Sequence, residues 1–144
     1  MTVFVLDASV TLAWFLEDQA SQATDDLLLE HVTRGAAAPT LWRWECVNVL
    51  LKTARALSLP KTAVDEELAL FRVHLDRTEV DAGDEAAFDR AVRLAVAHRL
   101  SSYDAAYLEL AIRRGLPLAT LDRALRRAAE AEGVAVLPEP AEAV

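Results

Sequence analysis

Short apolar segments alternate with longer, helix-like segments along the whole chain. Strand-like runs are predicted at residues 3–6, 36–38, 78–80, 116–119 and 134–137. Helical segments are predicted between them, at residues 9–16, 21–33, 41–57, 60–75, 84–98, 101–114 and 122–132. Strands that are separated by helices are joined by right-handed crossovers, which produce a mostly parallel sheet. The pattern therefore predicts an α/β fold.

Residues with known preferences for helix ends support these boundaries. Ser9, Ser21 and Asp84 stand where a side-chain oxygen can cap a helix. Gly35 and Gly133 stand where a helix is expected to stop. Within the segment 41–57, a further set is spaced as one helical face, which predicts that it lies in the core. Its members are Trp44, Val47, Leu51 and Ala54.

Length and composition indicate one domain. The chain has 144 residues, 53% of them hydrophobic, which is enough for a single core. We expect a domain over residues 1–137 and a frayed tail over residues 138–144. Cys46 is the one cysteine, so it is expected to pack in the core rather than form a disulfide.

The location expected from the sequence is the cytoplasm. No apolar run reaches the roughly 18 residues that a membrane span needs, so no membrane association is expected. The first residues carry neither a basic region nor a cleavage-like site, which argues against a signal peptide. The net charge of −8 argues against indiscriminate binding to nucleic acid, because the phosphate backbone is also negative.

Four acidic residues lie in apolar surroundings that do not favour them. Asp7 ends the first strand-like run, and Asp122 follows the run at 116–119. Glu45 lies in a tryptophan-rich stretch, and Asp104 begins an apolar helix. Open parallel sheets bind ligands at the carboxyl ends of their strands, where Asp7 and Asp122 stand. If the four carboxylates converge, their natural partner is Mg²⁺ or Mn²⁺, which prefers oxygen ligands.

Each acid also has a purely structural interpretation. Asp7 and Asp122 can cap the helices that follow them, although Ser9 and Thr120 offer alternative caps. Glu45 can belong to a solvated helix face, which it shares with Asn48. Asp104 stands three residues after Ser101, as in a capping box, and the helix dipole favours an acid there. Taken singly, none of the four acids decides the function.

The histidines are expected to be structural. His31, His74 and His98 lie late in helical segments, where a partly cationic side chain is favourable, and their spacing matches no metal motif. The serines lack a nearby histidine that would activate them, and no Gly-Lys-Ser/Thr phosphate loop occurs.

Combined, the segments are more specific than any one acid. They are Val5–Ser9, Pro39–Leu50, Leu100–Leu108 and Leu116–Asp122, with Gly133-Val134 before the last strand. This combination resembles the PIN-domain family, and within it the VapC toxins of type II toxin–antitoxin modules. The resemblance covers residues 3–137 and implies an α/β/α sandwich with a central, mostly parallel sheet. It also implies an endoribonuclease that depends on Mg²⁺ or Mn²⁺.

The resemblance also assigns roles to individual residues. The family's acidic, metal-binding and catalytic quartet corresponds to Asp7, Glu45, Asp104 and Asp122. Three further positions match polar neighbours of the site that contact substrate or orient the acids: Ser9, Asn48 and Thr120. Where some members have a fifth acid, this chain has arginines. The implied partners are an RNA substrate, a cognate antitoxin protein and a second copy of the chain in a homodimer.

Other functions remain open at this stage. A PIN-like protein without catalytic activity would only bind a partner. A Mg²⁺-dependent phosphatase would also use an aspartate after its first strand, but it needs a second acid where Ser9 stands. Trp14 is adjacent to Phe15, and Trp42 lies two residues from Trp44, so at least one large ring is expected to stay exposed and to mark an interface.

Overall fold

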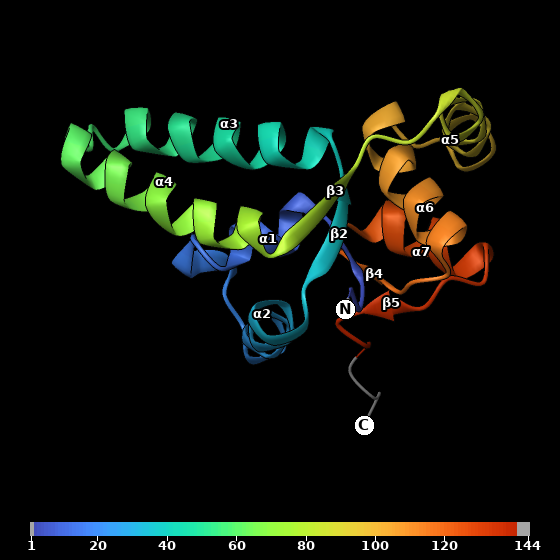
Figure 1. Cartoon of the computed structure of the whole chain (residues 1–144), viewed down its shortest axis with the longest axis horizontal. Helices are drawn as coiled ribbons and strands as arrows, with labels where there is room; N and C mark the ends of the chain where they lie inside the picture. The colour runs from blue at the N-terminus through green and yellow to red at the C-terminus, as the bar shows by residue number, and fades with distance from the viewer. Residues whose placement is uncertain (1, 141–144) are drawn as a thin grey trace.

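The computed structural model describes residues 2–140, which form a five-stranded, fully parallel sheet covered by helices (Figure 1). The elements, in chain order, are β1 (Val5–Leu6), α1 (Ala8–Ala13), the 3₁₀ turn η1 (Glu17–Gln19), α2 (Gln22–Arg34), β2 (Ala36–Pro39), α3 (Leu41–Ala56), α4 (Lys61–Asp76), β3 (Thr78–Asp81), α5 (Glu85–His98), α6 (Ser102–Arg114), β4 (Leu118–Ala119), α7 (Arg123–Ala131) and β5 (Val136–Leu137). Every predicted strand and helix is present. The α/β prediction is confirmed.

The sheet has the strand order β3-β2-β1-β4-β5. Val5 is in register with Ala37 of β2 on one side and with Leu118 of β4 on the other. From β1 the chain builds outward through β2 and β3, and it then returns to add β4 and β5 on the opposite side of β1. The direction of winding therefore reverses between β1 and β4, and crevices for ligands form at the carboxyl ends of strands at such a point.

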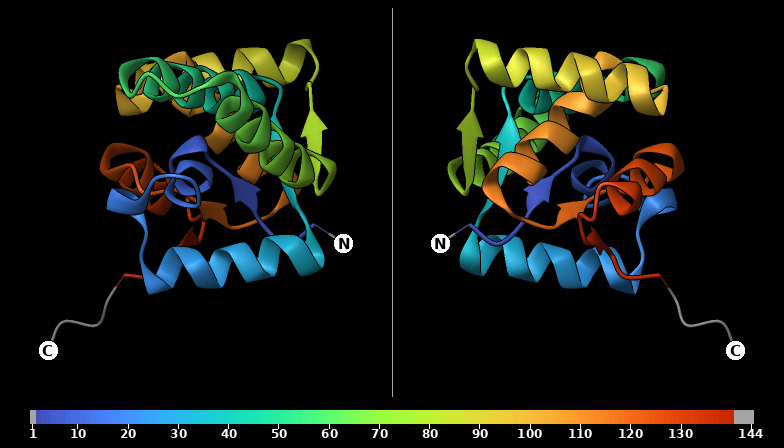
Figure 2. Two further views of the ribbon diagram at one scale, coloured as in Figure 1. Left: turned by 90° about the vertical axis from the view of Figure 1, so that its left-hand side faces the viewer. Right: turned by 90° about the vertical axis from the view of Figure 1, so that its right-hand side faces the viewer.

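The helices cover both faces of the sheet. Figure 1 shows α1 to α4 on one side of the strands and α5 to α7 on the other, as in an α/β/α sandwich. The antiparallel pair α3 and α4 extends away from the sheet, whereas α5 packs along α6 (Figures 1 and 2). No helix in residues 2–140 is long and apolar enough to cross a membrane.

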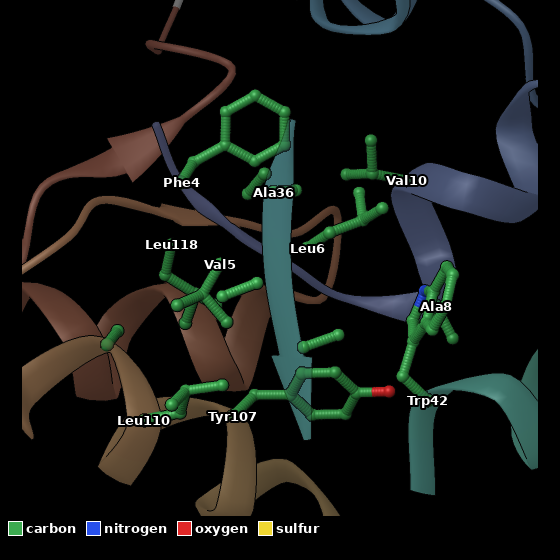
Figure 3. Packing of buried hydrophobic residues seen from close by; sticks show 14 of the residues in the cluster. Phe4, Val5, Leu6, Ala8, Val10, Ala36, Trp42, Tyr107, Leu110 and Leu118 are labelled. Atoms are coloured by element: carbon green, nitrogen blue, oxygen red, sulfur yellow. The ribbon is translucent and has the colours of Figure 1, made fainter. Parts of the chain in front are cut away.

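Burial on both faces explains why β1 is apolar throughout. Figure 3 shows Phe4 and Leu6 on one side of β1, and Val5 on the other side with Leu118 and Tyr107. These side chains are at most 1% exposed. Alternate residues of a strand point to opposite faces, so a strand that is covered on both faces carries no polar side chain. The last residue of this segment, Asp7, is the exception.

Trp42 anchors α3 to the first helix. Its ring is fully buried, and its indole Nε1 donates to the Thr11 hydroxyl at 2.9 Å. Burying a side chain of this size contributes about 3 kcal/mol to stability. The prediction for the α3 core face was wrong, because the buried positions are Trp42, Cys46, Leu50 and Ala54, whereas Trp44 is 68% exposed. Both tryptophans start helical stripes, and only the packing of α1 selects the one at Trp42.

The first helix also differs from its prediction. It runs over Ala8–Ala13 and begins after Asp7, so Ser9 lies inside its first turn and does not cap it. Elsewhere the caps are confirmed, with Ser21 accepting from the Thr24 N–H and Asp84 from the Ala87 N–H. Gly35 ends α2 at φ +82°, where an added Cβ would lie 3.1 Å from the Arg77 carbonyl oxygen.

Near its end, the described chain is held by a side chain of α7. Arg126 donates to the carbonyl oxygen of Pro138 at 2.7 Å. The rest of the tail, residues 141–144, lies outside the described residues, so its fraying stays a prediction.

Candidate active site

The site begins at Asp7, directly after β1. Its carboxylate is 5% exposed, and its Oδ2 accepts hydrogen bonds from Thr120 Oγ1 at 2.6 Å and from Ser9 Oγ at 2.8 Å. Asp7 occupies the N-cap position of α1 but makes no side-chain capping bond. The capping interpretation therefore does not explain this acid, and its side chain instead faces the end of the neighbouring strand β4.

Thr120 and Ser9 join β1 and β4 at their carboxyl ends. The Thr120 hydroxyl gives its single proton to Asp7 and accepts the backbone N–H of Asp122 at 3.1 Å. The Ser9 hydroxyl donates to Asp7 and accepts the backbone N–H of Leu121 at 2.9 Å. Both hydroxyls are thus used in two directions, and they fix the position of Asp7 relative to the chain that leads to Asp122.

Asp122 has a structural role as well as a place at the site. Its Oδ1 accepts the Leu125 N–H at 2.8 Å and caps α7, so the capping prediction is confirmed. Thr120 does not serve as that cap. Arg126, one turn into α7, donates to the Thr120 carbonyl oxygen at 2.9 Å. This arginine therefore fixes the loop between β4 and α7, and sequence reasoning did not assign it a role.

Glu45 lies in the second turn of α3 and is held by a tyrosine of α6. The Tyr107 hydroxyl donates to Glu45 Oε1 at 2.8 Å. The Tyr107 ring is fully buried, and Figure 3 shows its hydroxyl pointing toward Trp42 of α3. Sequence reasoning missed Tyr107. A signal was present, because a tyrosine in so apolar a helix needs a partner for its hydroxyl.

Asp104 lies in the first turn of α6, where its side chain is partly buried. Ser101 caps the helix by accepting the backbone N–H of Asp104 at 3.1 Å. The cap therefore uses the backbone of Asp104.

The four carboxylates lie within range of one another's charge. Burial raises the pKa of Asp7 more than the hydrogen bonds from Thr120 and Ser9 lower it, and the charge of Asp122 raises it further. The pKa of Asp104 is raised by burial, then by the charges of Asp122 and Asp7. The pKa of Glu45 is raised by burial and by the charges of Asp7 and Asp104, against the bond from Tyr107. Each acid is thus electrostatically coupled to at least two of the others.

In residues 2–140, no three acidic, histidine or cysteine side chains are arranged closely enough to hold a metal ion together. Hydrogen bonds account for the directions of three carboxylates. Asp7 is directed toward hydroxyls, Asp122 toward the α7 backbone and Glu45 toward Tyr107. Like charges also repel where no cation offsets them. The donor set nevertheless consists of carboxylate oxygens, which are the ligands that Mg²⁺ and Mn²⁺ prefer.

Asn48 is the one predicted site residue that the structure leaves apart. It lies one turn beyond Glu45 on α3, and its side chain is exposed. Among the described residues, no hydrogen bond joins Asn48 to the other six candidates.

A second acidic cluster, on the far side of α6, is structural. Glu109 is 3% exposed and accepts the Nε–H of Arg113, which also donates to both carboxylate oxygens of Asp81. Here the charges are paired, so the pKa of Asp81 is lowered by its bonds to Arg113. The contrast is informative, because the acids at the end of β1 and β4 have no arginine partner that lowers their pKa.

The sequence matches the model of the family described as "PIN domain" over residues 4–131. The chain belongs to the PIN-domain family. This match includes all four acids and both hydroxyls that bind Asp7. The PIN-domain resemblance and the sandwich architecture predicted from it are thereby confirmed.

Solved structures agree with this assignment at the level of the fold. PAE2754 from Pyrobaculum aerophilum is 24% identical with a TM-score of 0.70, and the alignment covers 94% of this chain and 90% of that one. A toxin–antitoxin complex from Klebsiella pneumoniae contains a chain that is 18% identical with a TM-score of 0.59, over 83% and 86%. VapBC2 from Rickettsia felis, bound to a promoter DNA fragment, gives 13% and 0.66, over 94% and 97%. No curated protein matches the sequence.

Proposed function

We propose that this PIN domain is a Mg²⁺- or Mn²⁺-dependent endoribonuclease that acts as the toxin of a type II toxin–antitoxin pair. The observation that carries the proposal is the coupling of Asp7, Glu45 and Asp104, whose pKa values are all raised by burial and by neighbouring acids. Buried acids that repel one another lower the stability of the fold, so their retention is best explained by a cation that they bind.

The cation would be held by Asp7, Asp104 and Asp122, with Glu45 at its edge or as a ligand of a second ion. When bound, it supplies positive charge that stabilises the negative charge developing on a phosphodiester. The residues of the chain supply orientation. Thr120 and Ser9 fix Asp7, and the cap on α7 fixes Asp122.

Glu45 is the candidate for handling the attacking water. Tyr107 holds one of its carboxylate oxygens and leaves the other free to accept a proton or a hydrogen bond. A raised pKa brings a carboxylate closer to neutral pH, where a general base works best. Because the four acids titrate as a coupled set, the proton belongs to the set as much as to Glu45. Attack by water leaves a 5′-phosphate on the product.

The exposed arginines of α7 can offset the net charge of −8 near the site. Arg123 and Arg127 follow Asp122 by one and five residues, and both are exposed. Arginine recognises phosphate through paired N–H donors. We expect these two residues to contact the RNA backbone beside the acids.

The antitoxin partner is proposed from the similar structures and from an exposed ring. Two of those structures are named as a toxin–antitoxin complex and as VapBC2. In this chain a groove of about 630 Å³ lies between α3 and α4, and its lining includes Trp44 and Phe71. Trp44 is 68% exposed, with the Arg43 guanidinium 5.9 Å from the ring centre.

The tryptophan first expected at this surface, Trp14, has a structural role instead. Its Nε1 donates to the Thr24 carbonyl oxygen at 2.8 Å, and its ring stacks on His31. Trp44 is therefore the residue to test for antitoxin binding. The antitoxin's basic residues would then reach the carboxylates and take the place of the cation's charge.

Cleavage of total RNA in Mg²⁺ or Mn²⁺ tests the proposed activity. Asp7→Asn should abolish cleavage, whereas Asp18→Asn, the same change at an exposed acid of η1, should not. Wild-type-like cleavage by Asp7→Asn would contradict the mechanism. The alternative, a PIN domain that only binds a partner, predicts no cleavage by any variant and no stabilisation by Mn²⁺. Finding a small protein with a DNA-binding segment encoded beside this chain would support the antitoxin proposal.

A further inference from the structure

The outer face of α5 carries an apolar stripe that nothing in residues 2–140 covers. Phe88 is 68% exposed, Val92 is 41% exposed and Val96 is 77% exposed. The opposite face of the helix, which includes the buried Ala87, packs against α6. Three large apolar residues at successive turns of one helix form a continuous surface, and such surfaces on soluble proteins mark interfaces.

Charged residues close this stripe at both ends, and the whole pattern is symmetric about Val92. Phe88 and Val96 lie four residues to either side of Val92, and Glu85 and Arg99 lie seven residues to either side. At 3.6 residues per turn, these five positions fall on one side of the helix. Glu85 begins α5, and Arg99 is its C-cap residue, so the two ends of the stripe carry opposite charges.

We propose that α5 packs antiparallel against α5 of a second copy of this chain, around a two-fold axis at Val92. Phe88 then meets Val96 of the second copy, and Glu85 meets its Arg99. The pairing deepens the homodimer that belongs to the proposed function, and it places the contact on α5.

Self-complementarity is the reason for choosing a second copy as the occupant. A two-fold interface brings each residue of a patch against the residue at the mirrored position. Here that rule pairs apolar with apolar and acid with base at all five positions. Antiparallel helices also place opposite ends of their dipoles together. A different protein would fit the apolar stripe equally well, but it would not require this symmetric placement of charge.

The position of α5 leaves room for such a contact. Figure 2 shows α5 at the outside of the molecule in both views, along one edge of the fold. A groove of about 260 Å³ lies between α5 and α6, and Phe88, Val92 and Tyr103 contribute to its lining. Tyr103 is 63% exposed. Side chains of the second copy that flank its own stripe can enter this groove and extend the interface beyond the two helices.

Charge exchange provides the sharpest test. Light scattering and sedimentation of the full chain at tens of micromolar should give the mass of a dimer. Glu85→Arg and Arg99→Glu should each weaken the dimer on the order of tenfold, because two symmetry-related pairs become repulsive. The double variant restores both pairs and should recover the affinity. If the double variant is as weak as the single ones, the antiparallel register is wrong.

A charge at the centre of the stripe tests the face itself. Val92→Asp places two carboxylates on the two-fold axis and should give a monomer. Val73→Asp, the same change at an exposed valine of α4, should leave a dimer. A wild-type monomer, or a dimer that survives Val92→Asp, would overturn the proposal. If the isolated chain is a monomer and Val92→Asp instead abolishes antitoxin binding, the face belongs to that partner.

These measurements do not depend on RNA cleavage and can be made with Asp7→Asn protein, so failure here would leave the ribonuclease proposal standing. Conversely, a dimer that responds as expected would stand even if no RNA were cut. Thermal midpoints of all variants should stay close to that of the wild type, because each changed side chain is exposed.

Discussion

The Thr120 hydroxyl donates to Asp7 Oδ2 at 2.6 Å and thereby connects the carboxyl ends of β1 and β4. Neither residue needs this bond to complete its own strand. The bond fixes a buried carboxylate whose pKa is already raised by burial. Thr120 also accepts the Asp122 N–H, so one side chain sets the spacing between two of the acids.

Thr120→Val should therefore impair the site while keeping the volume of the side chain. Losing the donor raises the pKa of Asp7 further, because a hydrogen bond to its charged form is removed. We expect a loss of about 1–3 kcal/mol in stability and a fall in cleavage of at least about tenfold. Urea unfolding and RNA cleavage measure the two effects. Thr33→Val, on the exposed surface of α2, is the matched control, and equal effects of the two changes would refute a special role for Thr120.

Tyr107→Phe tests whether the direction of Glu45 matters. The change removes one hydroxyl from the buried face of α6 and leaves Glu45 Oε1 without its donor. Cleavage should fall because Glu45 is free to turn, and its pKa should rise because the bond from Tyr107 lowers it. The pH–rate profile should consequently move to higher pH. Tyr103→Phe, one turn earlier on an exposed position of α6, should change neither cleavage nor the profile.

Much of the fold is contained in local sequence patterns. The caps at Ser21, Asp84 and Ser101 and the stop at Gly35 depend only on residues within one turn, so they are readable without tertiary information. The core face of α3 was not readable in this way. Trp42 and Trp44 both begin plausible apolar stripes, and the choice depends on Thr11, a residue 31 positions earlier that binds the Trp42 indole.

The site shows the same division. The four acids are visible because each contradicts its apolar neighbours. Their supports are less visible, since Tyr107 lies 62 residues from Glu45 and Arg126 binds backbone carbonyls, which carry no side-chain signature. Ser9 was expected as a cap because Ser is common there. Its actual bonds, to Asp7 and to the Leu121 N–H, require β4 to lie beside β1.

Metal binding should be visible as stabilisation. In EDTA at neutral pH, Asp7→Asn should raise the thermal midpoint, because it removes one of several repelling charges. A saturating excess of Mn²⁺ near 100 times its Kd should stabilise the wild type by about 2.7 kcal/mol but leave the variant unchanged. Lack of any Mn²⁺ effect on the wild type would argue against a metal site at these acids.

The raised pKa values also predict how the metal-free protein responds to pH. The acids Asp7, Glu45 and Asp104 bind protons more readily folded than unfolded. Their contribution to stability is therefore greatest below the unfolded values near 4 and is lost as the pH rises through the folded values. The stabilisation by Asp7→Asn should accordingly shrink at acidic pH. Urea unfolding in EDTA at several pH values measures it, and a gain that does not depend on pH would exclude charge as the cause.

The His31–His74 pair predicts a pH dependence of the opposite sign. The Thr78 hydroxyl donates to the His74 carbonyl oxygen at 2.7 Å, so His31 Nε2–H must donate to Thr78 at 2.9 Å. Neutral His31 then has a bare Nδ1, which accepts from His74 Nδ1–H at 3.3 Å. The expected partly cationic character is wrong for these two histidines, because burial lowers the pKa of both.

For His31 the pKa falls from 6.5 to about 4, since burial and the charges of His74 and Arg77 disfavour its cation. The unfolded chain therefore takes up a proton that the folded chain resists. Stability is fully present above pH 6.5 and declines as the pH falls toward 4, by about 3 kcal/mol in total. An NMR titration should show His31 and His74 still neutral at pH 6. A His31 ring that titrates near 6.5 without loss of structure would contradict the tautomer assignment, because the added proton would face the Nδ1–H of His74.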